Sequence, residues 1–147
     1  MKHKPRQWLL DKIGAVCQSQ RMSWHATSST HHIFFCWDHF FSNKTGQLKV
    51  MDLAWDNSKF GYFPMLEAIQ DCIKGKKNAG VLLQVIVEGT GEMFNNTAEV
   101  KYTKTSFYIE VDLRFDKEKG HYIGTRTDII PLCQDTCPLS NLSIQTK

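Results

Sequence analysis

The stretch that decides the fold is Trp55–Glu88, with the sequence WDNSKFGYFPMLEAIQDCIKGKKNAGVLLQVIVE. Its first half contains apolar residues at three- and four-residue spacing, which predict one buried helical face: Phe63, Leu66, Ile69 and Ile73. Pro64 suits the first turn of a helix, and Gly75 can adopt the left-handed conformation that ends one. We therefore expect a helix over residues 63–74.

The second half of this stretch is the most apolar part of the chain. Residues 80–87, GVLLQVIV, are rich in β-branched side chains and are apolar on both faces of an extended backbone. Such a run predicts a central strand that is covered on both sides. A helix that leads directly into a buried strand favours a sheet with helices packed against it.

The remaining elements follow from local patterns on either side of this stretch. They are a basic-faced amphipathic helix over 5–21, a polar connection over 23–30, a hairpin of strands 31–41 and 47–55 around the loop 42–46, a second hairpin of strands 97–104 and 106–116, and a last strand over 121–126. The sequence thus predicts an α+β fold. Two helices would pack on a mainly antiparallel mixed sheet of five to six strands.

Size and composition predict one globular domain. With 147 residues, of which 41% are hydrophobic, the chain can bury a substantial core. We expect this domain over residues 1–137, followed by a polar tail or the start of a linker over 138–147. The chain contains no apolar run long enough to cross a membrane and no signal-peptide core, so we expect a cytoplasmic protein. The five cysteines, an odd number, fit reduced thiols.

The distribution of charge and of aromatic residues favours a nucleic-acid-binding module. The net charge is +3, and the basic excess is concentrated in the N-terminal element. Cations bind phosphates, and aromatic rings stack on bases, especially on a base flipped out of a duplex. The candidates for phosphate contacts are Lys4, Arg6, Lys12, Arg114 and Arg126, and the candidates for stacking are Trp24, Trp55 and Tyr62. No cofactor or metal is expected for this function. For Trp24, packing at the edge of the core remains an alternative.

Two other functions stay open. Glu99-Val100-Lys101 has the acid-x-lysine spacing of metal-dependent nucleases, in which two carboxylates, here Glu99 with Glu88 or Glu92, would hold Mg²⁺. A solvated strand face explains the same residues. The other function is a protein-interaction or inhibitor module that uses a sheet edge.

Three further motifs are incomplete. His25-Ala26-Thr27 resembles one half of a twin His-x-Thr phosphodiesterase site, but the chain has no second copy. Gly89-Thr90-Gly91 follows a predicted strand as a dinucleotide fingerprint would, but Phe94 stands where the third glycine belongs. Cys133 and Cys137 have the wrong spacing for a zinc knuckle.

The order of elements from Trp55 to Val87 resembles the N-terminal modified-cytosine-reading domain of McrA-type restriction endonucleases. The resemblance consists of a strand that ends at Trp55, a polar turn, a helix over Tyr62–Ile73 and a strand over Val81–Val87. It implies a reader of modified bases in double-stranded DNA, which delivers a nuclease domain of the His-Asn-His class. That nuclease signature is not in this sequence, so the nuclease would be fused or associated.

Overall fold

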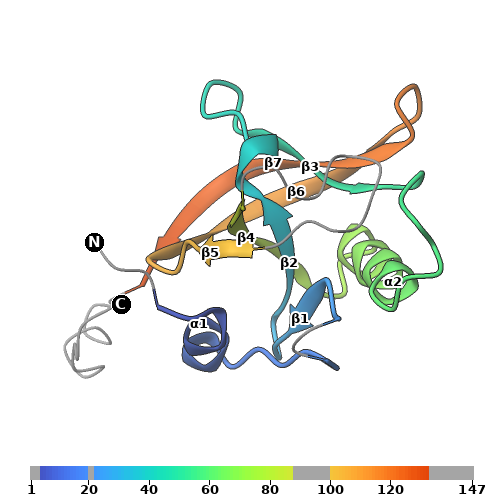
Figure 1. Ribbon diagram of the computed structural model, residues 1–147. Coiled ribbons are helices and arrows are strands. Elements are labelled where there is room, and N and C mark those ends of the chain that lie inside the picture. The colour runs from blue at the N-terminus through green and yellow to red at the C-terminus, as the bar shows by residue number, and fades with distance from the viewer. Residues whose placement is uncertain (1–3, 20–21, 88–99, 133–147) are drawn as a thin grey trace.

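The computed structural model describes residues 4–19, 22–87 and 100–132, which Figure 1 shows as a ribbon. Along the chain lie helix α1 (Arg6–Ile13), strands β1 (His25–Thr27) and β2 (His31–Trp37), a short 3₁₀ helix η1 (Asp38–Phe40), strand β3 (Gln47–Asp52), helix α2 (Tyr62–Ile73), and strands β4 (Asn78–Ile86), β5 (Val100–Thr103), β6 (Phe107–Asp116) and β7 (His121–Pro131). The predicted α+β fold with two α-helices is confirmed, although the sheet has seven strands. Neither α-helix in these ranges is long and apolar enough to cross a membrane.

All seven strands belong to one sheet. Its main order is β1-β2-β4-β6-β7-β3, and β5 is attached to β4. Only β2 and β4 run parallel, and the other pairs among the described strands are antiparallel. Parallel neighbours need a crossover connection, which here contains β3 and α2. The predicted central strand is confirmed, because β4 has neighbours on both edges.

The predicted hairpin between residues 31–41 and 47–55 is wrong. The loop between them does turn the chain, and Gly46 adopts a φ angle of 73° there. However, β2 already pairs with β1 on one edge and with β4 on the other. β3 instead pairs antiparallel with β7 at the far end of the sheet, with Asp52 opposite His121.

The predicted hairpin between residues 97–104 and 106–116 is also wrong. Thr103 of β5 lies opposite Gln84 of β4, and β6 pairs with an earlier part of the same edge of β4. The amide of Lys104 donates a hydrogen bond to the backbone of β4, so the chain continues along that strand. The linking residues, Lys-Thr-Ser, include no glycine or proline that would favour a reversal.

The N-terminal helix is shorter than the predicted range 5–21. α1 ends just before Gly14, whose φ angle of 71° places it in the left-handed conformation that ends helices. Val16 then forms an antiparallel bridge with Thr27. The segment 23–30, which the sequence predicts to be a connection, contains strand β1.

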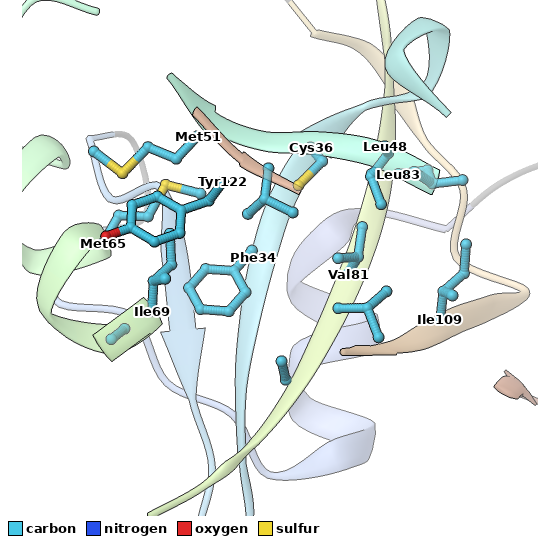
Figure 2. Packing of buried hydrophobic residues seen from close by; sticks show 14 of the residues in the cluster. Phe34, Cys36, Leu48, Met51, Met65, Ile69, Val81, Leu83, Ile109 and Tyr122 are labelled. Carbon is cyan, nitrogen blue, oxygen red and sulfur yellow. The ribbon is translucent and has the colours of Figure 1, made fainter. Parts of the chain in front are cut away.

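Helices cover both faces of the sheet. On the α2 face, Met65 and Ile69 of α2 approach Phe34 and Tyr122, as Figure 2 shows. The opposite, α1 face has its own cluster of buried side chains: Leu9, Leu10, Ala15, Ala26, Ile33, Leu82 and Tyr108. Successive residues of a strand point to opposite faces, so β2 and β4 contribute to both clusters.

The buried face of α2 is rotated relative to the predicted one. The helix buries Tyr62, Met65, Ala68 and Ile69. Phe63 and Ile73, which the sequence pattern assigns to the core, are 59% and 46% exposed. Both stripes have helical spacing and share Ile69, because α2 carries apolar side chains on more than one side. The pattern predicted the helix correctly but not its rotation about its axis.

Candidate nucleic-acid interface

The three predicted stacking residues lie together on the α2 face. The Trp24 ring is 5.8 Å from the ring of Trp55 and 6.2 Å from that of Tyr62, both in edge-to-face arrangements. Tyr62 is 5% exposed, and its hydroxyl donates a 2.8 Å hydrogen bond to the carbonyl of Leu53. These three rings pack against one another and against the core. The three rings therefore form a structural cluster at the start of α2.

Gly61, which precedes α2, lies directly against Trp24. A Cβ atom at position 61 would be 2.3 Å from Cγ of Trp24. The φ angle of Gly61 is −80°, which any residue adopts, so the cost of Gly61→Ala is steric. We expect this substitution to lower the free energy of unfolding by about 1–3 kcal/mol, as measured by urea denaturation.

The control for this prediction removes the neighbouring ring. In a Trp24→Ala background, Gly61→Ala should cost well under half as much, because the clashing atoms are gone. An equal cost in both backgrounds would contradict the packing of Trp24 on Gly61.

The predicted phosphate-binding residues are divided between two parts of the molecule. Three of them stand on or next to α1: Lys4, Arg6 and Lys12. Arg114 is exposed on β6, and Arg126 lies on β7 with its guanidinium 5.7 Å from the Phe41 ring. The structure therefore groups the first three cations, but it places them on the face opposite the Trp24 cluster.

Arg6 lies beside a different set of rings, which the sequence did not single out. Its guanidinium carbon is 4.2 Å from the centre of the Phe35 ring, and its Nη1 donates a 2.9 Å hydrogen bond to Oε1 of Gln84. Gln84 is the register partner of Trp37. Because residues 35 and 37 point to the same face of β2, Arg6 lies on the face of the sheet that carries both rings. We call Arg6, Phe35, Trp37 and His39 the Arg6–His39 surface.

The outer end of this surface is a pair of stacked rings. The Trp37 and His39 rings are 6.5 Å apart with an angle of 20° between their planes. His39 is exposed, and Phe35 and Trp37 are half-buried. Burial lowers the pKa of Arg6 from its ordinary value near 12.5, and an arginine side chain stays charged in proteins. The surface thus combines a fixed cation with partly open aromatic rings.

Lys104, which follows β5, has an acidic partner beside Trp37. Nζ of Lys104 donates a 2.8 Å hydrogen bond to Oδ1 of Asp38, the residue that follows Trp37. This ion pair holds η1 against the chain that leaves β5. The charge of Lys104 is therefore balanced by Asp38.

The acid-x-lysine motif lies only partly within the described residues. Lys101 is exposed on β5, whereas Glu88 and Glu99 lie outside those residues, as do the motifs at 89–94 and 133–137. Among the residues that the structure describes, no group of three or more His, Cys, Asp or Glu side chains is placed to hold a metal ion.

Comparisons with known proteins identified no relative of this chain. A scan against protein-family models, a search of curated proteins and a search of solved structures found no match to the chain. The class that the fold itself defines is an α+β domain with a mixed, mostly antiparallel sheet. Function must therefore be argued from the chemistry of its own side chains.

Proposed function

We propose that this chain is a nucleic-acid-binding module that holds an unpaired base on the Arg6–His39 surface. The observation that carries the proposal is the Arg6 guanidinium carbon 4.2 Å from the centre of the Phe35 ring, on the face of β2 from which Trp37, stacked with His39, also points. Stacking of a base on an aromatic ring contributes about 1–3 kcal/mol. A cation fixed among the rings adds attraction for the phosphate of the same nucleotide.

The neighbouring charges suit a nucleic-acid backbone. Lys4 and Lys12 are exposed on or next to the same helix as Arg6, so they can follow a chain of phosphates. The contacts of Arg6 with Phe35 and Gln84 hold its guanidinium in place before a ligand arrives. A group held in its binding geometry loses less conformational entropy on binding.

The location of the rings favours a base outside a duplex. Phe35 and Trp37 lie on the face of a sheet strand, where single-stranded nucleic acids are stacked in other protein classes. A base flipped out of modified double-stranded DNA presents the same open face. We propose this second ligand from the resemblance of Trp55–Val87 to the modified-cytosine-reading domain, together with a fused or associated nuclease as its partner.

Binding can be tested by fluorescence anisotropy with a labelled single strand, a plain duplex and a duplex that contains 5-methylcytosine. Trp37→Ala should weaken binding to the single strand by about 5- to 150-fold, the equivalent of about 1–3 kcal/mol. Trp55→Ala is the matched control, because Trp55 lies on the opposite face, and it should leave the affinity unchanged. Circular dichroism confirms that both variants are folded.

Salt dependence provides a second readout. Replacement of Lys12 by Gln should reduce the slope of log K against log salt by about 0.7 for a single strand if Lys12 contacts one phosphate. The absence of binding at low salt, or an affinity that Trp37→Ala leaves unchanged, would end the proposal. Tighter binding to the methylated duplex than to the plain one would support modified-base recognition.

A further inference from the structure

A pocket of about 540 Å³ opens on the α2 face between α2 and the β1–β2 hairpin. His25 and Thr27 of β1, His32 of β2 and Asp71 of α2 line it. The residues of the Arg6–His39 surface lie on the other face, so the pocket is independent of the proposed nucleic-acid site. It contains the residues of the His25-x-Thr27 motif, which the proposed function does not use.

Three side chains in this pocket form a continuous hydrogen-bonded relay. Oγ1 of Thr27 is 2.8 Å from Nδ1 of His32, and Nε2 of His32 is 3.4 Å from Oδ2 of Asp71. One tautomer satisfies both contacts: with its proton on Nε2, the ring donates to Asp71 and accepts from the Thr27 hydroxyl. A hydroxyl bonded to a base, which is itself oriented by a third group, is the arrangement that activates a nucleophile.

The environment of His32 suits a base. Its side chain is 8% exposed. Burial lowers the pKa of His32, and the hydrogen bond and charge of Asp71 act in the opposite direction. The lowered pKa favours the unprotonated ring, whose Nδ1 lone pair can take a proton.

We propose that Thr27, His32 and Asp71 form a hydrolytic site for neutral carboxylic esters. Thr27 is the nucleophile and His32 the general base, while Asp71 is a positioning residue that fixes the imidazole. The relay is assembled from three elements, β1, β2 and α2, and it faces a pocket large enough for a small substrate.

The reaction proceeds in two balanced steps. Oγ1 of Thr27 attacks the carbonyl carbon of the ester as Nδ1 of His32 takes the hydroxyl proton. The tetrahedral intermediate then expels the alkoxide, which leaves as the alcohol with the proton from His32. In the second step a water molecule, with His32 again as base, attacks the Thr27 ester and releases the carboxylic acid, which restores the hydroxyl.

The pocket wall indicates the class of substrate. Val16 and Phe63, which are 73% and 59% exposed, give it an apolar side. Glu67 and Asp71 add carboxylates, which repel anions such as phosphodiesters. The His-x-Thr half-motif therefore lies in surroundings that favour an uncharged ester with an apolar group.

His25 is placed to bind the substrate oxygen. Burial, and to a smaller extent the neighbouring His32, lowers the pKa of His25 to about 4. The ring is therefore neutral at pH 7. Its Nδ1 is buried and has no hydrogen-bond partner among the described residues. In the proposed site the N–H of His25 Nε2 would stabilise the negative charge that develops on the carbonyl oxygen.

The test is covalent labelling by a fluorophosphonate probe, followed by mass spectrometry of the intact chain and of its peptides. The wild-type chain should carry one adduct on Thr27, and it should hydrolyse p-nitrophenyl acetate. Thr27→Ser keeps the hydroxyl and should retain labelling. Thr27→Val has nearly the same shape without the hydroxyl, and it should lose the adduct and the ester hydrolysis.

Two further variants separate a catalytic role from a structural one. His32→Gln should slow labelling by about 100-fold or more, because it removes the base. Asp71→Asn should slow labelling and change its pH profile, since the amide no longer orients and stabilises the imidazole. If wild type and Thr27→Ser both carry no adduct at residue 27, or if Thr27→Val hydrolyses the ester as fast as wild type, the proposal is overturned.

Discussion

Replacement of Ile69 by alanine should lower the free energy of unfolding by about 2–5 kcal/mol. Ile69 is fully buried and packs within the cluster that joins α2 to the sheet (Figure 2). Its truncation removes buried methyl groups and leaves a cavity that the rigid sheet beside it can close only in part. Urea denaturation followed by circular dichroism measures the change.

Ile73 is the matched control, because it has the same side chain on the same helix and belongs to the same predicted stripe. It is 46% exposed, so Ile73→Ala should change stability by less than about 1 kcal/mol. Equal losses at the two positions would contradict the rotation of α2 about its axis and would favour the stripe read from the sequence.

The second large effect is a loss of stability in mild acid. The pKa of His25 is lowered to about 4, mainly by burial, whereas an unfolded chain protonates it near the ordinary 6.5. The unfolded state therefore binds more protons below pH 6.5, and the free energy of unfolding falls as the pH decreases from 6.5 to about 4. The contribution of His25 over this window is about 3 kcal/mol.

This acid effect can be assigned to one side chain. In His25→Phe the ring is kept and the titration is lost, so most of the slope between pH 6.5 and 4 should disappear. The pKa values of His32 and His121, which burial also lowers, leave a smaller residual slope of the same sign. The NMR titration of the His25 ring protons reports its pKa directly, and a midpoint near 6.5 in the folded protein would contradict the burial argument.

The helix and central strand of Trp55–Glu88 were predictable because local signals agree there. The stretch from Tyr62 to Ile73 has continuous helical spacing, and the following run is uniformly apolar and β-branched. Both elements formed where the sequence placed them, apart from one or two residues at their ends. The rotation of the helix was not predictable, since two apolar stripes compete and the choice depends on the shape of the sheet.

The strand pairings could not be predicted from local patterns. The turn before Gln47 was predicted correctly. The strand that β3 pairs with, however, is β7, which lies far along the chain and is not indicated by any local pattern. The same holds for β5 and β6, which share one edge of β4 instead of pairing with each other. At the N-terminus, the apolar periodicity predicts a helix to residue 21, but α1 ends at Ile13 because Gly14 adopts the left-handed conformation.

The sequence identified Arg6 as a cationic candidate but not its aromatic neighbours. Phe35 and Trp37 stood in a run that is aromatic on both faces, so the sequence did not show that these two side chains are only half-buried. The relay of Thr27, His32 and Asp71 could not be predicted from the sequence. The His-x-Thr spacing was its one local signal, since Asp71 is contributed by a distant helix.

The position of β3 also affects how the chain is made. β3 emerges from the ribosome before α2 and β4, yet its only strand partner within the described residues is β7, the last strand of the sheet. Until His121–Pro131 has been synthesised, the backbone groups of β3 have no native partner, and an unpaired strand is a template for association with other chains. We therefore expect nascent chains that stop before His121 to aggregate or to recruit chaperones, and the complete sheet to close only after synthesis has passed β7.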